Sequence, residues 1–344
     1  MKRIILYAIL WLCLYTTSAF AQVSVGDQGE FSGLVYSDYY WMAQHHNDDI
    51  EGKNGFWFRR IYATYEHGLS NGFSTRLRLE MNSSGDFQSD SEMIPNVKDA
   101  YLKWQNENHQ FLVGISGSPL FGTTEDVWSY RSIQKAPQDL YDFGSSRDFG
   151  LSFKGEFGNN EAFNYHLFLG NGNSNKPEID KGKKVSLALS YNFTGNIVIE
   201  GYGDYHSRTN NPDSYTAQIF GGYKSEQLNA GLLYSSQYRE SELGNPSQDL
   251  DLVSVFTNFT INEDISGYIR ADHLFDGYPN GGDNSYIPFA ENVESTFIVG
   301  GLDISLSDQV HLMPNIESII YGENLQENIP DTDIIPRLTL FYEF

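Results

Sequence analysis

Leu338-Thr339-Leu340-Phe341-Tyr342-Glu343-Phe344 is the stretch that most directly indicates the fold. Alternate residues from Leu338 to Phe344 are apolar and would share one face of a strand, while the residues between them are polar except Phe341. A strand that faces lipid on one side and a water-filled lumen on the other needs this alternation. The stretch therefore predicts the last strand of a transmembrane β-barrel.

This strand also resembles the C-terminal strand that Gram-negative outer-membrane barrels present to the barrel-assembly machinery. The resemblance implies that Tyr342 and Phe344, on the apolar face, act as an assembly signal. The barrel-assembly machinery is then an expected partner.

The first residues have the features of a secretory signal peptide. Lys2-Arg3 is followed by an apolar run over 4–15 and by Ala19-Phe20-Ala21, an A-x-A cleavage site. The apolar run is too short for a membrane span of about 20 residues. We predict a cleaved signal peptide at 1–21 and a barrel domain at 22–344. The single cysteine, Cys13, falls in the signal, so the exported domain has no disulfide.

Composition excludes several classes of protein. The formal charge is −23, and −25 once Lys2 and Arg3 are removed, which argues against nucleic-acid binding. Mean hydropathy is −0.42, and no later segment has the ~18 consecutive apolar residues of a membrane helix. Acidic loops suit a surface where divalent cations bridge anionic lipid. Outer-membrane lipid and lipopolysaccharide are thus expected partners.

Segments with a period of two recur along the chain and predict an all-β protein. Most are ten to thirteen residues long, the length that a tilted strand needs to cross a bilayer. Sixteen strands are expected, over 29–42, 54–67, 72–82, 96–105, 109–117, 147–157, 161–170, 183–193, 196–206, 214–224, 227–237, 250–262, 264–275, 294–306, 309–321 and 333–344.

The connections between these strands alternate in length. Seven short turns separate eight long links, as an even-numbered barrel with both termini in the periplasm requires. This pattern predicts a 16-stranded antiparallel transmembrane β-barrel in the Gram-negative outer membrane, with long extracellular loops and short periplasmic turns. Sixteen strands leave an aqueous channel, whereas eight would be filled by side chains.

The third long link, 118–146, is too apolar for a loop in water. It contains many large apolar side chains, Trp128 and Tyr141 among them. Loops of more than about 12–15 residues in a compact protein are usually functional or disordered. We expect this loop to fold inward and narrow the pore; a loop folded over the mouth, or a subunit contact, is the alternative.

Two stretches of the chain resemble the phosphate-selective porin O and P family. One is 128–137 (WSYRSIQKAP), continued by Asp139-Leu140-Tyr141 and 144–150 (GSSRDFG); the other is Phe58-Arg59-Arg60-Ile61-Tyr62. The resemblance implies a homotrimeric 16-stranded porin with an inward third loop and passive uptake of small anions. However, the exported chain has only twenty Lys and Arg against 45 acids, so selectivity for phosphate does not follow from the resemblance.

The parity of each strand indicates which charged side chains face the lumen. Arg76 and Arg78 share the polar face of one strand, whereas parity leaves Arg59 and Arg60 ambiguous. Late strands direct acids such as Glu200, Asp272 and Glu317 inward. The candidates for pore lining or constriction are Arg60, Arg76, Arg78, Lys103, Arg131, Lys135, Asp139 and Arg147.

Three functions remain open. The first is an outer-membrane porin that lets small hydrophilic solutes diffuse, with a mild preference for anions such as phosphate as one expectation. The second is a non-conducting barrel that acts as a surface adhesin or scaffold, and the third a soluble secreted β-sheet binding protein. The sequence has no H-E-x-x-H or G-x-S-x-G motif, so we expect no enzyme activity, no cofactor and no metal.

Overall fold

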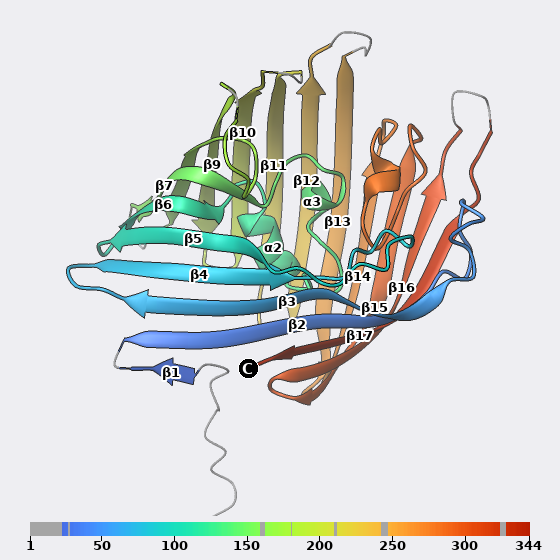
Figure 1. Cartoon of the computed structure of the whole chain (residues 1–344), viewed down its shortest axis with the longest axis horizontal. Helices are drawn as coiled ribbons and strands as arrows, with labels where there is room; N and C mark the ends of the chain where they lie inside the picture. The colour runs from blue at the N-terminus through green and yellow to red at the C-terminus, as the bar shows by residue number, and fades with distance from the viewer. Residues whose placement is uncertain are drawn as a thin grey trace, which may run out of the picture.

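The computed structural model describes residues 23–344 except 27, 159–161, 180, 210–211, 242–246 and 324–327. Within these residues, sixteen antiparallel strands, β2 to β17, pair in chain order. The last strand, β17, pairs with the first, β2, and so closes the barrel (Figure 1). The predicted signal peptide, 1–21, lies outside the described residues.

The sixteen barrel strands are Gly29–Trp41 (β2), Asn54–Gly68 (β3), Phe73–Met81 (β4), Asn96–Gln105 (β5), His109–Gly117 (β6), Arg147–Phe157 (β7), Phe163–Gly170 (β8), Lys183–Phe193 (β9), Ile197–Ser207 (β10), Ser214–Lys224 (β11), Leu228–Arg239 (β12), Gln248–Asn262 (β13), Ile265–Leu274 (β14), Ser295–Ser307 (β15), Val310–Tyr321 (β16) and Asp333–Glu343 (β17). The predicted all-β barrel is confirmed, and each predicted strand lies within two residues of an observed one. Four short elements were not predicted: β1 (Val23–Val25), α2 (Gly122–Trp128), α3 (Pro137–Leu140) and the 3₁₀ turn η2 (Gly281–Asp283).

The two faces of the wall differ in chemistry. On β9, Val185, Leu187 and Leu189 are about 40% exposed on the outer face, whereas Ser186 and Ala188 between them are buried inside. An apolar exterior suits hydrocarbon, and closure pairs the backbone groups of the sheet within the protein. Within the described residues, no helix is both long and apolar enough to cross a membrane.

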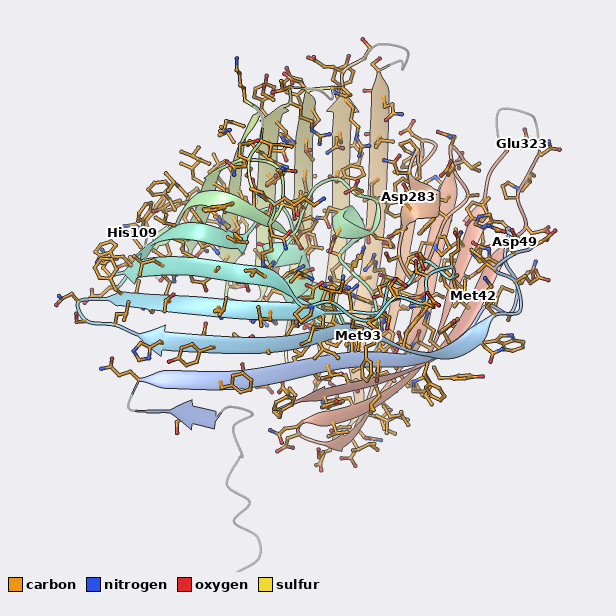
Figure 2. The ribbon with its side chains drawn as sticks, in the orientation of Figure 1. Met42, Asp49, Met93, His109, Asp283 and Glu323 are labelled. Carbon is orange, nitrogen blue, oxygen red and sulfur yellow. The ribbon has the colours of Figure 1, made fainter. Side chains whose placement is uncertain are left out.

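Long and short connections lie at opposite ends of the barrel. Figure 2 shows His109, beside a short turn, far from Asp49 and Glu323, which belong to long connections. By the predicted topology, the long-loop end is the extracellular mouth.

Two β-bulges change the inward face of strands β2–β7, which we call the early wall. The β2–β3 register shifts between Tyr36 and Ser37, so Arg59 has no partner on β2. The β4–β5 register shifts between Arg78 and Leu79, which leaves Lys98 without a partner in the same way. A bulge places two neighbouring residues opposite one and breaks the alternation of the strand. Both Arg59 and Arg60 consequently form ion pairs with inward-facing acids, and so does Lys98.

Candidate functional site: the lumen

The third loop, 118–146, packs on the lumen face of strands β10–β17, which we call the late strands or late wall. The Trp128 ring, at the end of α2, lies 5.3 Å from the Phe256 ring and 6.1 Å from the Tyr268 ring. Asn258 Nδ2 donates a hydrogen bond to the Trp128 carbonyl at 2.9 Å. In Figure 1, α2 and α3 lie inside the ring of strands. The apolar residues of this loop thus form a core with the barrel wall.

Polar contacts hold the rest of the loop. Gln138 Nε2 donates to Gln218 Oε1 of β11 at 2.6 Å, and Gln237 Nε2 of β12 donates to the Phe143 carbonyl at 2.6 Å. Arg270 of β14 donates to the Lys135 carbonyl. These contacts fix the loop to three late strands.

The charged side chains of the late wall are sealed beneath this loop. Arg270 pairs with Asp272, and Arg337 with Glu317 at 3.0 Å; all four are buried. Glu200, buried on β10, accepts a hydrogen bond from the Thr123 hydroxyl of the loop. The predicted inward orientation of these acids is right, but they do not face open lumen, because the loop covers them.

Polar space remains along the opposite wall, which strands β2 to β7 form. A cavity of about 450 Å³ is lined by residues of β2–β5, the third loop and Arg147, and includes Arg78 and Lys98. A second cavity of about 300 Å³, towards the short turns, is lined by Arg76 and Lys103 among others. Arg76 and Arg78 lie two residues apart on β4, so we call the two cavities together the polar path.

Basic side chains of the polar path share a few carboxylates. Asp99 Oδ2 lies 3.5 Å from Arg78 Nε and 3.9 Å from Arg76 Nη1, and Asp99 also pairs with Arg147. Arg76 pairs with Glu66 as well. Two carboxylates therefore serve three guanidinium groups, which leaves these five side chains with one more positive than negative charge.

Glu80 is shared in the same way. Its carboxylate lies 3.3 Å from Arg60 Nε and 2.8 Å from Lys98 Nζ. Lys103 and Lys154, which also face the lumen on the early wall, form no ion pair among the described residues.

The loop side of the path carries both signs of charge. Arg131 Nε lies 3.2 Å from Glu125 Oε1, and Arg131 Nη2 lies 3.5 Å from Asp139 Oδ2. Burial raises the pKa of Glu125 above its usual value, an effect that Arg131 partly offsets. Burial would also raise the pKa of Asp139, but Lys135 and Arg131 outweigh it and hold this pKa below its usual value.

The structure brings the eight predicted site residues to one side of the lumen. Arg60, Arg76, Arg78, Lys103 and Arg147 come from the early wall, and Arg131, Lys135 and Asp139 from the loop that faces it. The sequence prediction missed Lys98, because a bulge turns it inward. In the sequence, a bulge is indicated only at Arg59-Arg60, where two neighbouring charged residues leave the parity of the strand ambiguous.

The predicted assembly residues lie on the outer face of β17. Phe344 is 50% exposed, and its ring covers Gly33 of β2. The Gly33 N–H donates to the Phe344 carbonyl at 2.7 Å, and the Phe344 N–H donates to the Gly33 carbonyl at 2.9 Å. Tyr342 lies opposite Val35 in the same closing pair of strands.

One cluster among the described residues has the composition of a metal site. Ligand atoms of His45, His46 and Asp333, at the long-loop end, lie within 4.8 Å of one another. However, the Asn47 N–H donates to His45 Nδ1 at 3.0 Å, which places the proton of a neutral His45 on Nε2. His46 Nδ1 lies 3.0 Å from Asp333, and Tyr321 donates to Asp333 at 2.6 Å. These contacts describe a hydrogen-bonded clasp between the first loop and β17.

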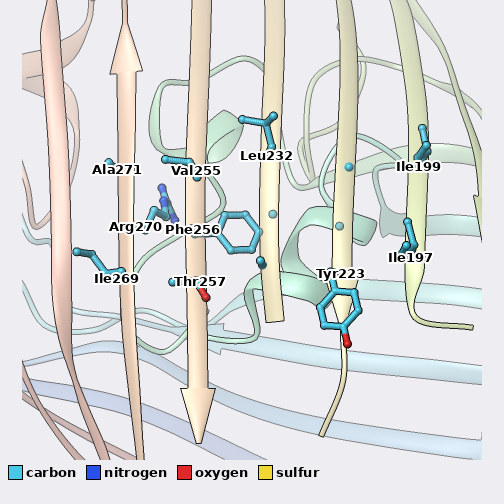
Figure 3. A pocket seen from close by; sticks show the side chains of 14 residues that line it. Ile197, Ile199, Tyr223, Leu232, Val255, Phe256, Thr257, Ile269, Arg270 and Ala271 are labelled. Carbon is cyan, nitrogen blue, oxygen red and sulfur yellow. The ribbon is translucent and has the colours of Figure 1, made fainter. Parts of the chain in front are cut away.

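One large hollow lies outside the lumen. It has a volume of about 720 Å³, and Figure 3 shows its lining on β10–β14, with Ile199, Leu232 and Val255 among the side chains. These three side chains belong to the exposed outer face. The hollow suits lipid hydrocarbon rather than a polar solute.

The comparisons with solved structures place this fold among outer-membrane channels. The structure is similar to OmpF of Salmonella typhi (TM-score 0.67, 13% identity, 94% of this chain and 100% of that chain). It is also similar to the outer membrane channel DcaP of Acinetobacter baumannii (TM-score 0.67, 11% identity, 94% of this chain and 99% of that chain). A third similar structure is the anion-selective porin from Comamonas acidovorans (TM-score 0.64, 12% identity, 92% of this chain and 99% of that chain). No family model matches the sequence, and no curated protein does.

The chain thus has the fold of the 16-stranded outer-membrane porins. That fold and the apolar outer wall agree with the predicted location, a multi-pass β-barrel in the outer membrane. The third function predicted from the sequence, a soluble binding protein, is wrong. In water, the outer face of this barrel would expose many large apolar side chains. The resemblance to the phosphate-selective porin O and P family stays a prediction.

Proposed function

We propose that this protein is a passive, non-enzymatic outer-membrane porin for small hydrophilic solutes. The observation that carries the proposal is the polar path, whose cavities are lined mainly by β2–β5 and lie beside the third loop inside the barrel. A barrel of this size has room for a water-filled channel. Solutes would cross by diffusion, without a cofactor or coupled energy.

We further propose a mild preference for anions, phosphate among them. Arg76, Arg78 and Arg147 share Asp99, and lysines without ion pairs stand beside them. Arginine can hold an oxyanion through two N–H groups. The overall charge of −23 has the opposite sign, but charges more than a Debye length of about 8 Å away are screened. Local charge should therefore dominate permeation.

The proposed partners follow from the fold and from the similar structures. A further similar structure, OmpT of Vibrio cholerae (TM-score 0.64, 13% identity), is described in a trimer form, and we propose a homotrimer for this chain too. Lipopolysaccharide would surround the long-loop end, and the barrel-assembly machinery would insert the barrel through the strand that carries Tyr342 and Phe344.

Recordings in planar bilayers test the proposal. The purified native protein should give discrete conductance steps, and under a salt gradient its reversal potential should lie near zero or on the anion side. Absence of steps from folded protein would favour the adhesin or scaffold, because a barrel of that kind has a plugged lumen. A reversal potential well on the cation side would overturn the anion preference alone.

A further inference from the structure

A small cavity next to the larger cavity of the polar path is lined by five cationic residues. It has a volume of about 20 Å³, and it is lined by Arg59, Arg60, Arg131, Lys135 and Arg337. The remaining lining consists of tyrosine, serine and glutamine, and no carboxylate lines the cavity. Cations this crowded repel one another strongly in a poorly hydrated interior.

The carboxylates that balance these arginines lie elsewhere. Arg59 is paired with Asp38, Arg60 with Glu80 and Arg337 with Glu317. Arg131 is paired with Glu125 and Asp139 of its own loop. Lys135 forms no ion pair among the described residues, and its Nζ lies 3.5 Å from the amide oxygen of Asn284. The space between the cations therefore contains no negative group of the chain.

Arg337 supplies donors that have no acceptor. Its side chain is 1% exposed, and one nitrogen, Nη2, donates to the Tyr286 carbonyl at 2.6 Å. The other two, Nε and Nη1, have no hydrogen-bond partner among the described residues. Buried guanidinium groups rarely leave donors unused, since each unmade bond costs free energy.

We propose that this cavity binds a single monatomic anion, a halide such as chloride. The volume suits one particle of about the size of a water molecule, which excludes phosphate and sulfate. A negative ion would accept hydrogen bonds from the free N–H groups of Arg337. It would also reduce the repulsion among the five cations, which a neutral water molecule cannot do.

The bound halide would fasten the third loop in place. Arg59 and Arg60 belong to β3, Arg337 belongs to β17, and Arg131 and Lys135 belong to the loop. One ion would thus join two wall strands to the element that narrows the lumen. The site is structural and does not depend on conduction, so it goes beyond the proposed function.

Urea titration of the folded full-length protein in lipid vesicles tests the proposal. Chloride is compared with gluconate at equal ionic strength, because gluconate is too large for the cavity. The folding equilibrium constant should rise in a saturable way, by about 100-fold at a halide concentration about 100 times Kd. Lys135→Met should remove most of this rise, whereas Lys183→Met, at an exposed position on β9, should keep it.

Crystals grown in bromide provide a second readout that does not depend on the stability of a variant. An anomalous peak between Arg337 and Lys135 is expected. Equal stability of the native protein in chloride and gluconate, together with no bromide peak, would show that the cavity holds only water and would overturn the proposal. A chloride effect that is the same in Lys135→Met and native protein would also overturn it, because the halide would then act elsewhere.

Discussion

Arg59 of β3 forms a buried ion pair with Asp38 of β2, and the same guanidinium donates to the carbonyls of Ser132 and Ile133 in the third loop. Asp38 also accepts a hydrogen bond from Thr339 of β17 at 2.6 Å. The strand pair that closes the barrel and the third loop inside it thus contact the same ion pair, Arg59 with Asp38. Closure of the barrel and position of the loop are expected to be coupled.

Replacing Arg59 by leucine tests this coupling. Arg59→Leu leaves the buried Asp38 without its ion-pair partner, which should destabilise the barrel by roughly 3–5 kcal/mol. The loop should also loosen and single-channel conductance should become larger or noisier. Urea titration and bilayer recording measure the two effects. The double variant Asp38→Leu with Arg59→Leu should recover much of the stability; if it is no more stable than Arg59→Leu, the ion pair is not the cause.

Deleting residues 120–140 should raise single-channel conductance. The deletion removes α2 and α3, which lie inside the barrel, and with α2 it removes the Trp128 ring that packs against Phe256 and Tyr268. A matched deletion of the exposed stretch 89–94, in the second long loop, should leave conductance unchanged. Unchanged conductance in the first variant would mean that the third loop does not limit flow, and would remove Arg131 and Lys135 from the pore lining.

Strand positions were readable from the sequence because the barrel wall enforces a period of two over many residues. The lipid needs apolar side chains at every outward position, so each strand repeats the same signal. Leu187 and Leu189, for example, are outward as their parity predicts.

The arrangement of charge was less readable, for two physical reasons. A bulge changes the in–out alternation of a strand at a single residue, and the sequence around Lys98 contains no pattern that predicts the bulge there. The third loop takes its course from contacts with strands far along the chain, such as that of Gln138 with Gln218. The residues that line the polar path could therefore be predicted as a group, but their ion pairs could not.

Deleting Phe344 should lower the amount of folded protein in the outer membrane. The deletion removes two backbone hydrogen bonds to Gly33 and the ring that covers this glycine at the closing seam. Heat-dependent mobility of membrane fractions on gels measures the folded amount. Phe344→Tyr, which keeps the ring and the backbone, should fold in near-native yield. A native yield from the deletion would count against an assembly signal at this residue.

Arg76→Ala with Arg78→Ala should shift the reversal potential towards cations. Loss of both guanidinium groups leaves Glu66 without its partner and Asp99 with only Arg147, so the middle of the polar path becomes more negative. Glu66→Gln, which removes an acid from the same path, should shift the potential the other way. If the double variant keeps the native reversal potential, these arginines are only wall residues and the proposed anion preference should be dropped.

Acidification should increase anion preference before most carboxylates titrate. Glu125 lines the larger cavity of the polar path, and burial raises its pKa above that of an ordinary glutamate. As the pH falls from neutral towards about 4, Glu125 gains its proton early, while Arg131 beside it stays charged. The path then loses one negative charge, and the reversal potential should move towards anions. Glu125→Gln should show the more anion-selective value already at neutral pH and lack this early shift.

Asp139→Asn is the matched control for the same titration. Asp139 also pairs with Arg131, but its pKa lies below the usual value because Lys135 and Arg131 outweigh the effect of burial. It therefore stays charged through the range in which Glu125 titrates, and its amide variant should keep the early shift. An early shift that disappears in Asp139→Asn and survives in Glu125→Gln would reverse the two assignments and place the titrating carboxyl group on α3 instead of α2.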